Sequence, residues 1–195
     1  MTGAAPQRER KAALRRELRS RRRAIDTARA QDCARCCADA LAASRLWRHS
    51  AHIGLYWPSD GELDPTPLAR RARRAGRRLY LPRIAGGGLE FADWNAGQPL
   101  LYNRYGIGEP TGPARALHQL DLLLLPLVGW TRDGDRLGMG AGFYDRTLGG
   151  AARRPVLVGL AYACQEVATL PRDDWDVQLD AVLTERGLQC CRGGG

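Results

Sequence analysis

The chain has 195 residues, of which 44% are hydrophobic and 26% charged, and its formal net charge is +9. This size and composition are typical of a single globular domain that can bury a sizeable core. They exclude a membrane-spanning helix, because no apolar run approaches the roughly 20 residues that a bilayer requires. The N-terminus lacks the apolar segment of a secretory signal, so we expect a cytoplasmic protein without a membrane partner.

The positive net charge makes nucleic acid a candidate partner. Basic residues concentrate at 15–23 and 70–78, and Lys11 is the only lysine among the 30 basic residues. One hypothesis is therefore a basic, non-enzymatic RNA- or nucleotide-binding protein that uses residues 8–23. RNA-binding modules stack bases on surface aromatic side chains, and this segment has none. We therefore expect no nucleic-acid partner.

The six cysteines and three histidines do not predict a metal or catalytic site. Cys33 and Cys36 form a CxxC pair, but no second pair follows at the spacing of a zinc site. We expect the cysteines at 33–37 to be small, partly buried residues of a helix. The histidines show no catalytic spacing.

The N-terminal part of the chain is predicted to be helical. Residues 6–48 are rich in alanine and have leucines at roughly helical spacing. Asp26 and Thr27 divide this region into two helices, with Thr27 as the expected cap. We expect the ends of the chain, 1–7 and 190–195, to be disordered.

Strands and helices alternate after this region. The expected elements are strands at 51–58, 77–84, 86–94, 120–130, 155–162 and 180–185, a helix at 65–75 capped by Asp64, a loop at 101–113 and a helix that opens at 142–144. Alternation with apolar strands predicts one α/β domain over 1–195. It has three layers, with a mostly parallel sheet, helices on both faces and an N-terminal helical arm. Ligands of such sheets bind beyond the carboxyl ends of the strands.

A glycine-rich segment, DGDRLGMGAGFYDRTL, lies at one such end, at residues 133–148. Glycines allow the backbone to approach a phosphate closely, and a following helix N-terminus adds positive charge. Arg136 adds guanidinium donors, and Asp145 supplies the oxygen ligand that Mg²⁺ prefers. These features suffice for a Mg²⁺–nucleotide site. A purely structural turn is the alternative interpretation.

Three other segments carry polar side chains of interest. Glu62, in the loop before the helix at 65–75, either binds a polar ligand or belongs to a solvated cap loop. Lys11 and Arg15 share a helix face, which either binds a ligand or is solvated. One of four aspartates late in the chain could bind a metal together with Asp145. The local sequence does not indicate which of them does so: Asp173, Asp174, Asp176 or Asp180.

Taken together, these segments resemble the 5-formyltetrahydrofolate cyclo-ligase family, also called 5,10-methenyltetrahydrofolate synthetase. The resemblance runs from Lys11 to about Glu185. It rests on KAALRRELRSRRRAI, YWPSDGELD, RRLYLPRI, YGIGEP, DLLLLPLVGWTRDGDRLGMGAGFYDRTL and PVLVGLAYACQEVATLPRDDWDVQLDAVLT, in this order. The run RLGMGAGFYDR is the most specific of these motifs.

The resemblance implies an enzyme that joins ATP hydrolysis to ring closure of 5-formyltetrahydrofolate, with Mg²⁺ as cofactor. The formyl oxygen attacks the γ-phosphate, nitrogen N10 attacks the resulting imidate phosphate, and phosphate leaves. The implied catalytic residues are Arg136 and Asp145, and the implied metal ligands are Asp145 and Asp176. The implied ATP contacts are Lys11, Arg15, Arg136, Leu137, Gly138, Met139, Gly140, Ala141, Gly142, Phe143 and Tyr144. The implied folate contacts are Trp57, Glu62, Met139, Gly140, Ala141, Gly142 and Phe143.

The chain departs from the family pattern at three places. Pro65 stands where the family usually has threonine, Ala141 replaces a lysine of some members, and Phe143 replaces the first of two tyrosines. None of these changes removes a phosphate-binding or metal-binding group. A related ATP-dependent enzyme of thiamine metabolism stays an alternative. We expect a monomer whose partners are ATP and 5-formyltetrahydrofolate.

Overall fold

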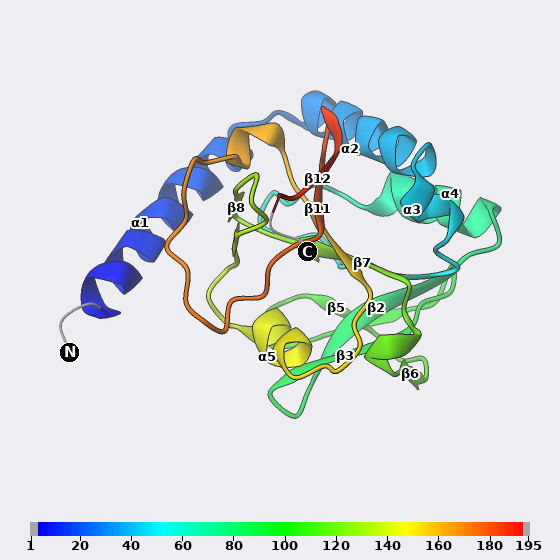
Figure 1. Ribbon diagram of the computed structural model, residues 1–195. Coiled ribbons are helices and arrows are strands. Elements are labelled where there is room, and N and C mark those ends of the chain that lie inside the picture. Colours follow the sequence, from blue (N-terminus) through cyan, green and yellow to red (C-terminus); the bar gives the residue numbers. More distant parts are fainter. Residues whose placement is uncertain (1–3, 193–195) are drawn as a thin grey trace.

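The middle of the protein is one sheet of eight strands, seen in a computed structural model that describes residues 4–192 (Figure 1). From one edge to the other, the strands are β12 (Gly187–Cys190), β11 (Ala181–Thr184), β10 (Val156–Leu160), β7 (Leu122–Pro126), β1 (His52–Gly54), β2 (Arg78–Ala85), β3 (Gly88–Asp93) and β6 (Ala114–Arg115). The strands from β11 to β2 are parallel, and β12, β3 and β6 are antiparallel.

The central strand β7 shows why the sheet is covered on both sides. Leu122 and Leu124 pack into the core on one face, while Leu123 and Leu125 pack into the core on the other. All four leucines are fully buried. A strand with no polar position has no face for water, as is typical of parallel sheets.

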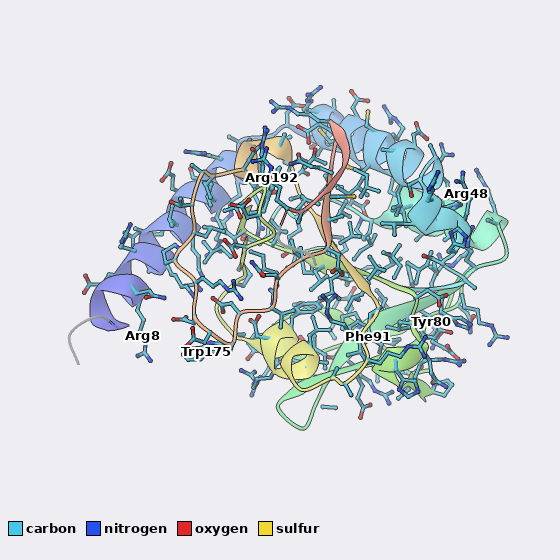
Figure 2. All side chains as sticks on the ribbon, in the orientation of Figure 1. Arg8, Arg48, Tyr80, Phe91, Trp175 and Arg192 are labelled. Atoms are coloured by element: carbon cyan, nitrogen blue, oxygen red, sulfur yellow. The ribbon has the colours of Figure 1, made fainter. Side chains whose placement is uncertain are left out.

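Helices complete the outer layers. The helices α2 (Thr27–Ala42), α3 (Arg45–Arg48) and α4 (Thr66–Arg74) cover the first face, where they form a core with Leu122 and Leu124. On the second face, Leu148 of α5 (Phe143–Gly149) belongs to the same buried cluster as Tyr80 and Phe91. Figure 2 labels Tyr80 and Phe91 in the part of the molecule below the sheet centre, near α5. The prediction of a three-layer α/β fold with a mostly parallel sheet is confirmed. Within residues 4–192, no helix has both the length and the apolar character to cross a bilayer.

The N-terminal helix α1 (Ala4–Arg23) is packed against the domain, along the carboxyl end of the sheet (Figure 1). Leu18 is fully buried with Val128 and Leu137. A Cβ atom at Gly129 would lie 2.5 Å from the Leu18 Cδ1 atom, so any larger residue there would displace Leu18. The docking of Leu18 brings the polar face of α1 to the end of β7.

Three local predictions about the helices were inexact. The cap of α2 is Asp26, which accepts a hydrogen bond from the Arg29 N–H at 2.8 Å, and not Thr27. A further break occurs at Ser44, which caps α3. At α4 the N-cap is Pro65 and not the predicted Asp64, so the helix begins one residue after the predicted start. Asp64 still accepts a hydrogen bond from the Thr66 N–H at 2.8 Å.

Some short strands were not predicted. The segment expected as a loop contains the hairpin of β4 (Leu100–Tyr102) and β5 (Gly108–Pro110), and the segment after β7 contains β8 (Gly129–Trp130) and β9 (Arg136–Leu137). Two 3₁₀ turns occur at Leu117–Gln119 and Ala163–Gln165. Strands of two or three residues depend on their pairing partners, so local pattern does not reveal them.

The expected disorder at the chain ends is corrected over part of its range. Residues 4–7 belong to α1, and Gln7 donates to the Asp173 carboxylate at 2.8 Å. Cys190 belongs to β12, paired with Ala181. These ends are ordered by tertiary partners. Residues 1–3 and 193–195 lie outside the described residues.

Candidate active site

The glycine-rich segment lies beyond the carboxyl end of β7, with its glycines 138–142 between β9 and α5, and α1 holds it in place. The Arg15 Nε–H donates to the Gly138 carbonyl oxygen at 2.8 Å. Gly140 has a φ of +104°, and a side chain there would lie 3.4 Å from the Arg15 guanidinium carbon. The backbone angle requires glycine at 140, and the arginine packs directly against it. The arm and the glycine segment therefore form one unit.

Lys11 lies between two carboxylates of the late acidic segment. Its Nζ is 2.7 Å from Asp173 Oδ2 and 2.7 Å from Asp176 Oδ2. Burial alone would lower the pKa of Lys11, but the hydrogen bonds to Asp173 and Asp176 outweigh it and raise the pKa. The only lysine of the chain is thus a buried ammonium, held in its charged form by two carboxylates, at the position predicted for ATP binding.

Asp145 is held from two sides. The buried Arg136 donates from Nη2 to Asp145 Oδ1, and the Val177 N–H donates to the same oxygen at 3.2 Å. The Arg136 side chain is 4% exposed, and its Nε–H has no described partner. Arg136 therefore orients Asp145 and is less available to a phosphate than the sequence indicated.

The two predicted metal ligands come from segments that meet. Asp176 Oδ2 accepts from Lys11 and from the Asp173 N–H at 2.9 Å, and the next residue, Val177, binds Asp145. No described residue donates to Asp145 Oδ2 or to Asp176 Oδ1. Over residues 4–192, no group of three or more acidic, histidine or cysteine side chains could hold a metal ion. One or two carboxylates nevertheless suit Mg²⁺, which takes its remaining ligands from phosphates and water.

Glu62 is almost withdrawn from solvent, with 7% of its side chain exposed. Its carboxylate accepts a hydrogen bond from the Ser59 N–H at 3.1 Å and lies 4.0 Å from Arg22 Nη1. Burial raises the pKa of Glu62 to about 7, although Ser59 and Arg22 act in the opposite direction. A carboxyl group that titrates near neutral pH can both donate and accept a hydrogen bond to a polar ligand.

Arg22 was not selected from the sequence, yet it connects the segments of the site. Its side chain is fully buried, and its N–H groups donate to the Asp60 carboxylate at 2.7 Å and to the Leu127 carbonyl oxygen at 3.2 Å. Nη2 also lies 4.0 Å from the Met139 sulfur atom. Arg22 thus joins α1 to the Glu62 loop, the end of β7 and the glycine segment.

Asp60 is the carboxylate that neutralises the charge of Arg22. Arg19, Arg22 and Arg23 all form ion pairs with it. Burial would raise the pKa of Asp60, but hydrogen bonds from the arginines outweigh it and lower the pKa. Asp60 has a φ of +51°, which is uncommon for a residue other than glycine. The three ion pairs stabilise this conformation, and the conformation fixes the loop before Glu62.

Arg22 connects Glu62 to the glycine segment, because its Nη1 lies 4.0 Å from Glu62 Oε1 and its Nη2 lies 4.0 Å from the Met139 sulfur atom. Burial raises the pKa of Tyr144, and the negative charge of Glu62 raises it further. Arg136 acts on Tyr144 in the opposite direction, with its guanidinium 6.0 Å from the ring centre. The structure therefore brings together segments that the sequence analysis treated separately.

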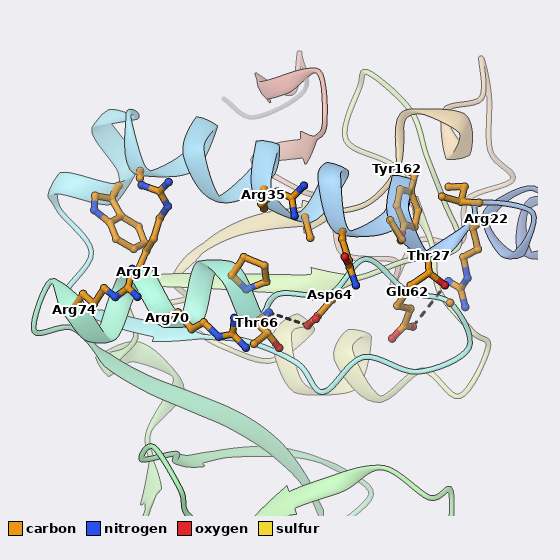
Figure 3. A pocket seen from close by; sticks show the side chains of 18 of the residues that line it. Arg22, Thr27, Arg35, Glu62, Asp64, Thr66, Arg70, Arg71, Arg74 and Tyr162 are labelled. Carbon is orange, nitrogen blue, oxygen red and sulfur yellow. Dashed lines mark hydrogen bonds and ion pairs between the residues drawn. The ribbon is translucent and has the colours of Figure 1, made fainter.

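Two of the predicted folate contacts, Glu62 and Trp57, line different cavities. Glu62 and Arg22 lie at one end of a groove of about 1250 Å³ between α2 and α4, with Arg70, Arg71 and Arg74 along α4 (Figure 3). Trp57 instead lines a smaller pocket of about 330 Å³ next to Trp94. Trp57 is therefore not part of the groove at Glu62.

Comparison with known proteins gives the same family as the motifs. The model of the 5-formyltetrahydrofolate cyclo-ligase family matches residues 7–185. The chain belongs to this family. A 5-formyltetrahydrofolate cyclo-ligase of Escherichia coli K12 is 38% identical over 179 residues, which cover 86% of this chain and 96% of that protein. A mouse protein of the same name is 26% identical and covers 90% of this chain and 93% of its own length.

Solved structures of 5,10-methenyltetrahydrofolate synthetases have the same fold as this family member. The Aquifex aeolicus structure superposes with a TM-score of 0.82 at 29% identity, over 95% of this chain and 94% of its own. The Mycoplasma pneumoniae structure has a TM-score of 0.74 at 27% identity, over 90% of this chain and 98% of its own. The likeness extends over nearly the whole cyclo-ligase domain.

Proposed function

We propose that this family member converts 5-formyltetrahydrofolate to 5,10-methenyltetrahydrofolate with Mg²⁺ and ATP, releasing ADP and phosphate. The observation that carries the proposal is the convergence of three distant segments: α1, the glycine-rich segment and the loop at 173–177. Together they place Lys11, Arg15, Asp145 and Asp176 in one cluster. Cations, a close backbone and oxygen ligands are what phosphoryl transfer requires.

The nucleotide side of the site uses the arm. Lys11 has three N–H donors, and the two carboxylates engage two of them, so one donor stays available for a phosphate oxygen. Arg15 donates from Nε to Gly138 and keeps its terminal N–H groups for the phosphates at the glycine segment. Lys11 and Arg15 would both neutralise the negative charge of the phosphates, without forming a covalent intermediate.

The free oxygens of Asp145 and Asp176 would hold Mg²⁺. When bound, the ion would neutralise phosphate charge and reduce the repulsion between these carboxylates and the nucleotide. Arg136 and the Val177 N–H keep Asp145 in one orientation, and Lys11 does the same for Asp176. The protein's own contribution is therefore a fixed pair of ligands.

The folate side of the site uses Glu62 and Trp57. Glu62 would bind the polar edge of the pterin, and its pKa of about 7 means that both protonation states are populated at neutral pH. Arg22 and Ser59 hold the carboxyl group in position. The formyl oxygen would then face the γ-phosphate, and after its attack N10 closes the ring as phosphate leaves.

The test is to mix the protein with 5-formyltetrahydrofolate and ATP in the presence of Mg²⁺. We expect the absorbance of methenyltetrahydrofolate to appear together with one phosphate per ring closed, and neither signal when one substrate is omitted. ATP hydrolysis without methenyltetrahydrofolate would indicate a related enzyme with another substrate. RNA binding with a steep salt dependence and no turnover would favour the rival hypothesis of a nucleic-acid-binding arm.

Small molecules are the only partners in this proposal, and the protein acts as a monomer. Lys11, Arg15, Arg19 and Arg22 all contact the protein's own carboxylates or carbonyl groups. This use of the arm supports a role in the enzyme over a role in binding nucleic acid. Light scattering at the concentration of the activity assay would test the monomeric state.

A further inference from the structure

The turn at residues 173–176 presents a tryptophan to solvent beside the nucleotide side of the site. The Asp176 N–H donates to the Asp173 carbonyl oxygen at 3.0 Å, and the Asp173 N–H donates to Asp176 Oδ2 at 2.9 Å. These two hydrogen bonds close the turn, so Asp174 and Trp175 occupy its two corners. Both corner residues are exposed, and Figure 2 labels Trp175 at the bend of this loop, beside α1.

Contacts with α1 hold this turn in place. Lys11 Nζ lies 2.7 Å from the carboxylates of both Asp173 and Asp176. The Gln7 side chain donates to the Arg172 carbonyl oxygen at 3.0 Å, just before the turn. The backbone that carries the tryptophan is therefore fixed. A ring on a fixed backbone loses little conformational freedom when a ligand packs against it, so little binding energy is spent on ordering it.

The surroundings of Trp175 differ from those of the other four tryptophans. Trp47 and Trp130 are buried, and Trp57 and Trp94 pack against each other, whereas the Trp175 side chain is 70% exposed. Within residues 4–192, it belongs to none of the buried clusters, and no aromatic ring or cation stacks on it. Its indole therefore keeps an aromatic face free for a ligand.

The helix α1 arranges the contacts of the site along one line. Arg22 lies next to Glu62, at the folate side. Arg15 donates to the glycine segment, and Lys11 binds the turn that carries the tryptophan. An α-helix rises about 1.5 Å per residue, so Lys11 lies about 16 Å along α1 from Arg22. The turn is therefore at the end of the site that is far from Glu62.

The proposed reaction sets the direction in which ATP extends along this line. The γ-phosphate has to face the formyl oxygen, and the folate lies at the Glu62 side. The ribose and the base therefore extend from the phosphates in the opposite direction, past Lys11. The exposed ring at that end belongs to Trp175. Met139 is also exposed but lies at the folate side, because its sulfur atom is 4.0 Å from Arg22 Nη2.

We propose that the indole of Trp175 stacks on the adenine base of ATP and contributes to the affinity for the nucleotide. This inference rests on the proposed function. Two planar ring systems in offset contact gain dispersion energy and remove apolar surface from water. The phosphates and the metal are held by other residues, so the contribution of Trp175 is confined to ligands that carry a base.

The experiment compares the binding of ADP and of pyrophosphate by calorimetry, both in the presence of Mg²⁺. Pyrophosphate keeps two phosphates and lacks the ribose and the base. Trp175→Ala should weaken the binding of ADP by about tenfold, equivalent to about 1.4 kcal/mol, and leave the binding of pyrophosphate unchanged. Trp175→Phe keeps an aromatic ring and should retain most of the affinity for ADP. Asp174→Asn, at the other corner of the turn, is the matched control and should bind both ligands like wild type.

A merely structural role for Trp175 gives a different result. A disturbed turn would displace Lys11 and Asp176, so ADP and pyrophosphate would both bind more weakly by the same factor, and this result would overturn the proposal. Unchanged binding of ADP in Trp175→Ala would overturn it as well. If Trp175→Ala does not fold, Trp175→Leu serves in its place, because leucine is apolar but has no aromatic face.

These binding measurements are separate from the test of the proposed function, because they require neither 5-formyltetrahydrofolate nor turnover. Weaker binding of ADP alone in Trp175→Ala, in a protein that forms no methenyltetrahydrofolate, would reject the proposed reaction and retain the stacking role. Formation of methenyltetrahydrofolate by Trp175→Ala with the wild-type KM for ATP would retain the reaction and reject the stacking role.

Discussion

Arg22 Nη1 lies 4.0 Å from Glu62 Oε1, with the Arg22 side chain fully buried and Glu62 nearly so. Arg22 belongs to the same helix as Lys11 and Arg15, the residues proposed to bind ATP. The same Nη1 donates to the Leu127 carbonyl oxygen, and Nε and Nη2 donate to Asp60, so Arg22 cannot move independently of the Glu62 loop. One helix therefore sets the positions of both the nucleotide side and the folate side of the site.

Arg22→Ala should strongly destabilise the protein. Removing one partner of a buried ion pair typically costs about 3–5 kcal/mol, because the other groups stay buried without a partner. Urea unfolding followed by circular dichroism measures the change. The matched control is Arg23→Ala, whose exposed side chain pairs with the same Asp60. The control should lose less than about 1 kcal/mol, and equal losses in the two variants would remove Arg22 from its proposed role.

Glu62→Gln should change how stability depends on pH. The pKa of Glu62 is about 7 in the folded protein, against an ordinary value of 4.5. Between these values the folded protein binds more protons than the unfolded chain, so stability falls as pH rises, by at most about 3 kcal/mol. Glutamine does not titrate, so the variant should gain stability relative to wild type from about pH 5 to about pH 8. Parallel stability curves over this range would contradict the assignment.

The same substitution should affect the two substrates unequally. Glu62 lies in the loop assigned to the folate, and Lys11 and Arg15 lie in the part assigned to ATP. Glu62→Gln should raise the KM for 5-formyltetrahydrofolate by about tenfold, the effect of losing one charged hydrogen bond, and should change the KM for ATP little. Steady-state kinetics with each substrate varied in turn measures both. A rise confined to ATP would show that the loop serves the nucleotide.

The sequence allowed the fold and the composition of the site to be predicted, because both depend on strong local patterns. The run Leu122–Leu125 indicates a strand buried on both faces, and the glycine segment follows it directly. The position of Arg22 could not be predicted, because it stands in a run of three arginines and only packing shows which one is buried. The ion pair of Arg136 with Asp145 depends on the turn into α5, and that turn is set by tertiary contacts.

Lys11→Ala should weaken the use of ATP. Loss of a charge-assisted contact typically costs about 1.5–3 kcal/mol, or roughly 10–150-fold in kcat/KM for ATP. The substitution also leaves Asp173 and Asp176 without their ammonium partner, so unfolding is measured alongside. Arg16→Ala, an exposed cation on the same helix, is the control for a general loss of positive charge. Unchanged ATP kinetics in Lys11→Ala would reject the nucleotide assignment of the arm.

Asp145→Asn distinguishes a metal ligand from a residue that merely stabilises the start of α5. Asp145 lies in the first turn of this helix, where a negative charge typically contributes about 0.3–1 kcal/mol. A role limited to the helix predicts an active enzyme of slightly lower stability. A metal ligand contributes several kcal/mol to the transition state, so turnover should fall by roughly three orders of magnitude.

Asp145→Asn also lowers stability in a way that is separate from the helix and the metal, because asparagine leaves the buried Arg136 without its carboxylate partner. Circular dichroism shows whether the variant is folded, and a Mg²⁺ titration of the remaining rate then separates the roles. Metal binding predicts that the half-saturating Mg²⁺ concentration rises in Asp145→Asn and is unchanged in Asp174→Asn, an exposed neighbour of the second ligand. If the two variants and wild type have overlapping Mg²⁺ curves, Asp145 orients Arg136 and the helix but does not bind the metal.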